Sequence, residues 1–182
     1  MRHNVLMSGL GGQGVLMAGQ LLAQAAIEAG LETSWFPSYS PEVRGGSVEC
    51  TLVVSDGRVG SPVVGRPQAA ILMAPVCVDQ YAPKIEPGGI AVLNVGMGKV
   101  AVGRDDVRVV EVDANAIARE AGSERVVNLV LAGAWLGLVM PELIDKAVDA
   151  LARVLPERHH KLIPMNAAAL RAGAQAAEQQ AG

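Results

Sequence analysis

A glycine-rich hexapeptide near the amino terminus has the residue types and spacing to bind a phosphate. It reads Gly9-Leu10-Gly11-Gly12-Gln13-Gly14 and fits the pattern G-x-G-x-x-G. Because glycine has no Cβ atom, the backbone can turn sharply and a ligand can approach it closely. A helix that starts directly after the turn points unpaired N–H groups at the bound group. The candidate contacts for a phosphate or pyrophosphate are Gly9, Gly11, Gly12, Gln13 and Gly14.

A second segment with unusual residue types spans residues 37–47 and reads Pro-Ser-Tyr-Ser-Pro-Glu-Val-Arg-Gly-Gly-Ser. Its two prolines and its glycine pair predict an irregular loop. Loops of this length in compact domains are commonly functional or disordered. Because this one combines an aromatic residue, an acid and an arginine with a flexible Gly-Gly pair, we expect a functional loop.

The sequence disfavours NAD as the ligand of the glycine turn. Dinucleotide-binding domains carry an Asp or Glu about 20 residues further on, where it holds a ribose hydroxyl. The second predicted strand, residues 32–36, has no acid at its end, and Glu28 and Glu32 fall too early. A phosphate site and a tight turn without any ligand remain as alternatives.

The elements around the turn alternate between strand and helix patterns. A short apolar run before it, residues 5–7, predicts a buried strand, and the apolar spacing of residues 15–29 predicts a helix. Further strands are predicted at 48–54, 69–74, 90–95 and 107–112. A hairpin turn at Asp56-Gly57 is predicted to lead from the first of these to a partner strand that begins at residue 58. Further helices are predicted at 78–85, 113–121, 126–139 and 141–155. Such an order predicts an α/β, Rossmann-like three-layer domain with a mostly parallel sheet and helices on both faces.

The helix predicted at 126–139 is apolar nearly all round and should be buried. Gly133 and Gly137 lie four residues apart and would let another backbone pack closely, either a neighbouring helix or a partner subunit. The Ala-rich tail from Asn166 predicts a further helix, which we expect to fray after Gly173. No domain boundary is evident, so residues 1–182 are expected to form one domain.

Composition excludes several classes of protein. The 182 residues carry a net charge of −3 without a long basic block, which argues against a nucleic-acid partner. The longest apolar stretch, 126–140, is too short to span a membrane, and no signal-peptide pattern precedes the first strand. Cys50 and Cys77 belong to no C-x-x-C pair, so no metal or iron–sulfur site is expected. Two lone buried thiols in strand-like surroundings indicate a reducing compartment, and we expect a cytoplasmic protein.

Three stretches together resemble the gamma subunit of 2-oxoacid:ferredoxin oxidoreductases, the catalytic domain of the pyruvate/ketoisovalerate type. These are the glycine turn, residues 39–47, and Val127-Asn128 at the start of the buried helix. The specific part is Tyr-x-Pro-Glu-x-Arg-Gly-Gly within residues 39–46. The resemblance covers residues 3–173, and residues 39–47 and 161–166 are most similar to the 2-oxoglutarate branch. Indolepyruvate oxidoreductases carry a related beta-type subunit, whose loop centres on Ser-Gln-Arg-Gly-Gly.

The resemblance implies a subunit that is inactive alone. The family oxidatively decarboxylates a 2-oxoacid with coenzyme A, giving acyl-CoA, carbon dioxide and electrons for ferredoxin. Thiamine diphosphate, Mg²⁺ and iron–sulfur clusters are expected on alpha, beta and delta partner subunits. This chain lacks both cluster cysteines and the Gly-Asp-Gly signature with a downstream Asn, and Ser55-Asp56-Gly57 is better explained as a hairpin. We assign no catalytic residue to this chain.

Coenzyme A is the ligand that the resemblance leaves for this subunit. Its pyrophosphate would lie on the glycine turn, and Arg44 offers a planar fork for phosphate oxygens. Glu42 would orient Arg44, and Tyr39 would stack on adenine or pack against the pantetheine arm. Gly45, Gly46 and Asn128 complete the candidate contacts. The alternatives are an intersubunit ion pair for Arg44, interface packing for Tyr39 and a helix-end hydrogen bond for Asn128.

Two other functions remain open. The chain could be an independent Rossmann-like nucleotide-binding protein, which would bind NAD or FAD tightly on its own. It could also be a purely architectural subunit without a ligand. When alone, it could self-associate through the Gly133 and Gly137 face or through the loop that follows Tyr39.

Overall fold

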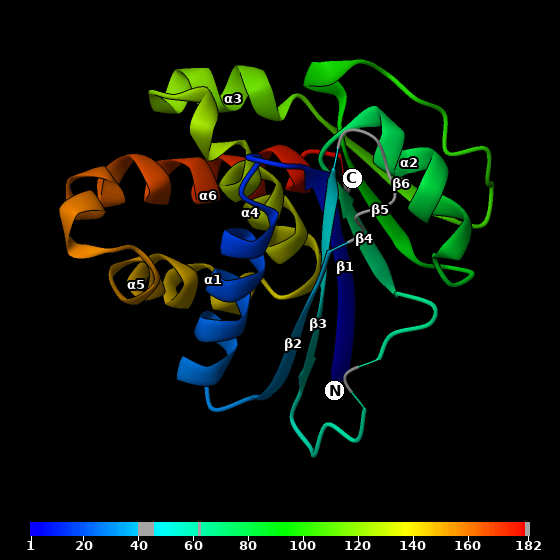
Figure 1. The fold of residues 1–182 in the computed structure, drawn as a ribbon, viewed down its shortest axis with the longest axis horizontal. Coiled ribbons are helices and arrows are strands. Elements are labelled where there is room, and N and C mark those ends of the chain that lie inside the picture. Colours follow the sequence, from blue (N-terminus) through cyan, green and yellow to red (C-terminus); the bar gives the residue numbers. More distant parts are fainter. Residues whose placement is uncertain (40–45, 62, 181–182) are drawn as a thin grey trace.

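A central sheet with helices on both faces forms the molecule (Figure 1). The structure is a computed structural model, and it describes residues 1–39, 46–61 and 63–180. The predicted α/β class and the Rossmann-like three-layer arrangement are confirmed. Six strands make up the sheet: β1 (Arg2–Leu10), β2 (Glu32–Tyr39), β3 (Ser47–Ser55), β4 (Ala69–Leu72), β5 (Ile90–Asn94) and β6 (Arg108–Val112).

The strands lie in the order β2-β3-β1-β4-β5-β6. β1, β4, β5 and β6 pair in parallel, as their apolar runs predict. β3 runs antiparallel to both β1 and β2, so the whole sheet is mixed. The carboxyl ends of the parallel strands therefore share one edge of the sheet with the β1–α1 turn.

The hairpin predicted at Asp56-Gly57 is wrong. β3 pairs with β1 and β2, and residues 58–61 form no strand. The Ser55 hydroxyl oxygen instead accepts the Gly57 N–H at 3.1 Å. The turn therefore ends β3 and leads into a connection that crosses to β4.

β2 continues through Pro37, where we expected irregular structure to begin. The strand reaches Tyr39 and pairs on one side only, with β3. An edge strand tolerates a proline because the missing N–H can face away from the neighbouring strand. The predicted loop is thus shorter at its start, and residues 40–45 lie outside the described part of the chain.

The helices cover the two faces of the sheet unequally. Their bounds are α1 (Val15–Glu28), α2 (Pro75–Tyr81), α3 (Ala114–Ala121), α4 (Val127–Val139), α5 (Ile144–Val154) and α6 (Ile163–Glu178). Short 3₁₀ helices lie at η1 (Ala82–Lys84), η2 (Val95–Met97), η3 (Glu124–Val126), η4 (Pro141–Leu143) and η5 (Glu157–Leu162). Figure 1 shows α1, α4, α5 and α6 on one side of the sheet and α2 on the other. Along β1, Val5 and Met7 join the larger core beneath α1 and α4, whereas Leu6 joins the smaller core beneath α2.

Two predicted helix starts can be compared directly with the structure. Asp113 caps α3 as predicted, because its carboxylate accepts the Ala116 N–H at 2.9 Å. The helix predicted at 78–85 begins earlier, at Pro75, where a missing N–H costs nothing. It ends at Tyr81, before the 3₁₀ turn that contains Pro83.

The glycines of the buried helix α4 pack against another helix of the same chain. A Cβ atom on Gly133 would overlap the Leu170 carbonyl oxygen, and one on Gly173 would overlap the Val130 carbonyl oxygen. α4 and α6 therefore touch along their main chains. The Gly133 and Gly137 face of α4 is therefore buried against a neighbouring helix of the same chain, so it is not available to a second copy. Among the described residues, no helix is long and apolar enough to cross a membrane.

The end of α6 protects an edge of the sheet. α6 continues past Gly173 to Glu178, and the fraying expected there stays a prediction. Just beyond it, the Gln180 side chain accepts the Glu111 N–H at 3.1 Å and donates to the Glu111 carbonyl oxygen. The Gln180 amide thus pairs with the N–H and C=O groups of Glu111 on the edge strand β6, which could otherwise bond to a strand of another chain.

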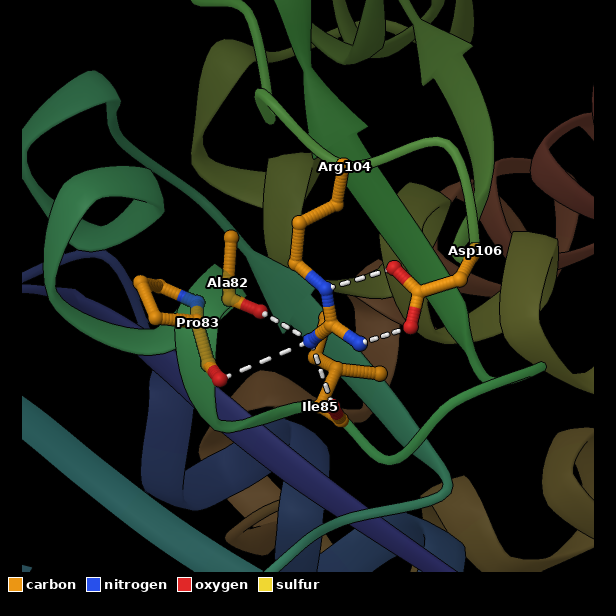
Figure 2. Close-up of polar contacts among 5 residues, drawn as sticks. All are labelled: Ala82, Pro83, Ile85, Arg104 and Asp106. Carbon is orange, nitrogen blue, oxygen red and sulfur yellow. Dashed lines mark hydrogen bonds and ion pairs between the residues drawn. The ribbon is translucent and has the colours of Figure 1, made fainter.

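An arginine anchors the connection between β5 and β6 to the end of η1 (Figure 2). Arg104 pairs with Asp106 through two contacts, Nε to Oδ1 at 2.8 Å and Nη2 to Oδ2 at 2.5 Å. Its Nη1 donates to the carbonyl oxygens of Ala82 and Ile85 at 3.2 and 2.5 Å. The guanidinium, by hydrogen bonding and by its charge, holds the pKa of Asp106 below its usual value. One side chain therefore closes a helix end and fixes a long connection.

Replacing Asp106 by Asn should remove a pH-dependent part of the stability. A carboxylate whose folded pKa is depressed stabilises the fold above its ordinary pKa of 3.8, and this contribution is lost as pH falls through the lower folded value. Asp106→Asn should therefore unfold at lower urea concentration than the parent at pH 7, and the difference should shrink toward pH 3. A difference that stays constant with pH would show that the ion pair does not contribute.

Replacing Gly173 by Ala should destabilise the protein although alanine favours helices. Propensity alone predicts a gain of roughly 1 kcal/mol in a helix interior. Overlap with the Val130 carbonyl should outweigh it, because overpacking a close contact costs roughly 1–3 kcal/mol. Urea unfolding measures the balance. Gly57→Ala is the control, since nothing lies within 4 Å of its Cβ position, and it should be near neutral.

Candidate functional site

The glycine turn joins the carboxyl end of β1 to the first residue of α1. Gly12 and Gly14 have φ values of 86° and 76°, in the left-handed region that favours glycine. Gly14 is the N-cap of α1, and no side chain caps the helix or places an acid in its first turn. The first N–H groups of α1 are thus without side-chain acceptors, as an anion site at a helix start requires.

Gln13 shapes the turn with its side chain. Its Oε1 accepts the Leu10 N–H at 2.7 Å, and its Nε2 lies 3.1 Å from the Met97 sulfur. A Cβ on Gly9 would lie 2.8 Å from that same Oε1. The side chain of Gln13 therefore braces the turn and requires a glycine at position 9, while the contacts available to a ligand are main-chain N–H groups.

The second predicted segment meets the turn at its last glycine. Gly11 donates its N–H to the Gly46 carbonyl oxygen at 3.0 Å. Gly46 has a φ of 58°, again left-handed, and leads directly into β3. Tyr39 ends β2 opposite Val48, which brings both ends of the segment to this edge of the sheet. The predictions for Glu42, Arg44 and Gly45 lie outside the described residues.

Asn128 ties the start of α4 to the start of α1. Its side-chain amide donates to the Gly14 carbonyl oxygen at 3.0 Å and lies 3.5 Å from the Met17 sulfur. Asn128 is only 4% exposed, and its amide nitrogen lies where a Cβ on Gly14 would need space, at 2.6 Å. The helix-end hydrogen bond weighed for Asn128 is therefore present, and it runs to the other helix. Two helix N-termini converge on one turn as a result.

Two open pockets flank Gly12. One of about 340 Å³ lies between the turn, Met97 and the η3 region, and another of about 300 Å³ lies over the first turn of α1. Among the described residues that line them, Arg125 is the one cation and Glu124 the one anion. Glu124 is already paired with Arg119 at 2.6 Å. The exposed guanidinium of Arg125 is therefore the charge that an anion on the turn would meet.

Arg125 is a site residue that the sequence reasoning missed. The signal for it is its position, two residues before Val127, the first residue of α4. A cation is disfavoured at a helix N-terminus by the helix dipole, so an arginine there calls for an explanation. An anion bound between the two helix starts would supply one.

The two cysteines are free and buried, as predicted. Cys50 lies in β3, but Cys77 lies in α2 and not in strand-like surroundings. Burial raises the pKa of the Cys50 thiol to about 11 and also raises that of Cys77. Both thiols are thus protonated near neutral pH and poor nucleophiles. Among the described residues, no group of three or more His, Cys, Asp and Glu side chains could hold a metal.

The fold and the site define a Rossmann-like α/β domain with a glycine turn between its first strand and helix. The chain belongs to the pyruvate ferredoxin/flavodoxin oxidoreductase family, whose model matches residues 4–176. The family recognised from the three sequence stretches is therefore confirmed.

Individual relatives agree with this assignment. The chain is 37% identical to the ketoisovalerate oxidoreductase subunit VorA of Methanothermobacter thermautotrophicus, over 96% of this chain and 36% of the relative. It thus spans about a third of the length of that relative. The gamma subunit of a keto/oxoacid ferredoxin oxidoreductase from Geobacter sulfurreducens superposes with a TM-score of 0.82 at 25% identity, over 97% of this chain and 99% of that one.

A larger enzyme contains the same fold. A 2-oxoglutarate:ferredoxin oxidoreductase from Magnetococcus marinus, solved with 2-oxoglutarate, coenzyme A and succinyl-CoA bound, matches with a TM-score of 0.82 at 21% identity. The match covers 98% of this chain and 31% of that one. At this identity the likeness shows the fold alone, and the 2-oxoglutarate branch stays a prediction.

Replacing Gly14 by Ala should cost more stability than replacing Gly12 by Ala. Both positions have left-handed backbones, so the backbone strain should be similar, roughly 1–2 kcal/mol. Only at Gly14 would the new Cβ meet Asn128, which should add roughly 1–3 kcal/mol. Urea unfolding of both variants measures the difference. In the Gly14→Ala background, Asn128→Ala should recover part of the loss, and equal effects of the two glycine substitutions would contradict the contact.

Proposed function

We propose that this chain is a gamma-type subunit of a 2-oxoacid:ferredoxin oxidoreductase complex that contributes to coenzyme A binding and to assembly. The complex would convert a 2-oxoacid to its acyl-CoA by oxidative decarboxylation, and 2-oxoglutarate is our proposed substrate. The observation that carries the proposal is the hydrogen bond from Gly11 to Gly46. It joins the glycine turn and the Gly-Gly loop of the family at the uncapped start of α1.

The chemistry of coenzyme A suits this site. Its pyrophosphate can accept hydrogen bonds from the N–H groups of Gly12, Gly14 and Val15, where no side chain competes, whereas the Gln13 N–H already donates to the Leu10 carbonyl oxygen. Arg125 stands beside the turn as a second positive group. Arg44 lies two residues before Gly46, so the chain is short enough to place its guanidinium at the same turn. Tyr39, Glu42, Gly45 and Asn128 remain the other proposed contacts.

The redox cofactors do not fit this chain. Cys50 and Cys77 are buried and lie in different elements, which cannot ligate an iron–sulfur cluster. No thiamine diphosphate signature occurs in the sequence. We therefore place thiamine diphosphate, Mg²⁺ and the clusters on alpha, beta and delta subunits, with ferredoxin as acceptor of the complex. The free thiols suit a cytoplasmic enzyme. The part of this chain is to hold and orient the thiol carrier.

The alternative of an independent nucleotide-binding protein has less support. β2 ends in Pro-Ser-Tyr, so no acid stands where a ribose hydroxyl would be held. An architectural subunit without a ligand would leave unexplained the exposed Arg125 beside the turn, at a helix start where the dipole disfavours a cation. A beta-type subunit of an indolepyruvate oxidoreductase shares the fold but is expected to carry Ser-Gln in place of the Pro-Glu-x of residues 41–43.

Substituting Arg125 or Arg44 should weaken coenzyme A binding without dissociating the complex. In the complex assembled with alpha and beta partners, Arg125→Ala and Arg44→Ala should each raise the KM for coenzyme A roughly tenfold, as loss of one charge-assisted hydrogen bond implies. Arg44→Lys should recover only part, because lysine lacks the fork. The control is Arg153→Ala, which removes the same charge from α5, where Arg153 pairs with Glu28 at the far end of α1.

The same assay distinguishes the alternatives. Size-exclusion chromatography reports assembly: a raised KM in an intact complex supports coenzyme A binding, whereas loss of assembly in the arginine variants would favour an architectural subunit. Turnover by this chain alone, or tight binding of NAD or FAD in titration calorimetry, would overturn the proposal.

A further inference from the structure

A further cavity adjoins the glycine turn and has no role in the site described above. Its volume is about 540 Å³, and it lies between the starts of α1 and α4, the η5 turn and α6. It shares Gly14 and Met17 with the pocket over the first turn of α1, and Arg125 with the pocket beside Met97. A molecule held on the turn can therefore extend into this cavity without crossing the protein interior.

The walls of the cavity are mainly apolar. They include Leu129, Leu155 and Leu162, together with the flexible side chains of Met17 and Met165. Methionine side chains adapt to irregular aliphatic shapes. Such a lining favours a neutral, partly aliphatic ligand over a sugar or a charged group.

Two buried amides interrupt this apolar lining. Asn128 and Asn166 line the cavity, and each is 4% exposed. Among the described residues, Asn166 has no hydrogen-bond partner for its side chain, and Asn128 uses only its nitrogen, toward Gly14 and Met17. In the described part of the chain, these amide atoms are not among the buried polar atoms that lack a partner, so they face the open cavity, where a ligand can bond them. A ligand amide offers both the N–H donor and the C=O acceptor that an asparagine side chain matches.

We infer that this cavity receives the pantetheine arm of coenzyme A, with Asn166 and the Asn128 oxygen bonding its amides. The inference rests on the proposed binding of the carrier at the glycine turn. Pantetheine is a neutral aliphatic chain with two amide groups, and it begins at the pyrophosphate that would lie on the turn. The cavity begins at the same place, at Gly14. Asn166 thereby becomes a specificity-determining residue for the arm and not for the nucleotide.

A comparison of coenzyme A with its nucleotide part tests this inference. The assembled complex is assayed for the KM of coenzyme A and for the Ki of adenosine 3′,5′-bisphosphate, which lacks the arm. Asn166→Leu keeps the side-chain shape and removes the amide. It should raise the KM for coenzyme A about tenfold and leave the Ki unchanged. Leu162→Trp, which fills the cavity, should do the same by excluding the arm.

A matched control removes an amide from the same helix. Gln175 is exposed on α6 and does not line the cavity, so Gln175→Leu should change neither constant. The inference fails if Asn166→Leu and Leu162→Trp leave both constants unchanged or raise both equally. If Arg125→Ala also changes neither constant, the proposed function fails with it. If Arg125→Ala raises both constants while the cavity variants change neither, only the inference on the arm is lost.

Discussion

The site depends on the start of α1, which no side chain caps. Gly14 stands at the N-cap of α1 in a left-handed conformation that offers no side-chain acceptor. Asn128 holds its carbonyl and the Gln13 side chain holds the neighbouring turn, so the turn is fixed while no side chain accepts the first N–H groups of α1. The glycine turn must therefore be held rigid by neighbouring side chains while the first N–H groups of α1 stay accessible to a ligand. Packing of α4 on the sheet and against α6 supplies the rigid support.

The strand and helix pattern could be predicted because it depends on local periodicity. β1, the turn and α1 follow from the apolar spacing on either side of the glycines, and Asp113 marks the start of α3 through its short side chain. The hairpin at Asp56-Gly57 failed because a turn signal shows where a strand ends and not which strand pairs with it. Pro37 was misjudged for the same reason: whether a proline is tolerated depends on an edge position, which is a property of the sheet.

The candidate site was predictable in its main-chain part and less so in its side chains. The glycine turn and Gly46 are contiguous motifs, and the structure brings them together through one hydrogen bond. Arg125 escaped notice although it directly precedes the helix predicted at 126–139, because its relevance appears only when α4 starts beside α1. Gln13 looked like a ligand contact, yet its amide folds back on Leu10. Asn166 belongs to the stretch 161–166 that carries part of the resemblance, but its place beside the cavity could not be predicted, since its burial comes from the packing of α6.

A structure of the assembled complex with coenzyme A tests the central claim most directly. The account predicts that the pyrophosphate oxygens lie about 3 Å from main-chain N–H nitrogens between Gly12 and Val15. It would be contradicted by density that places the pyrophosphate elsewhere, with neither the turn nor Arg125 within reach.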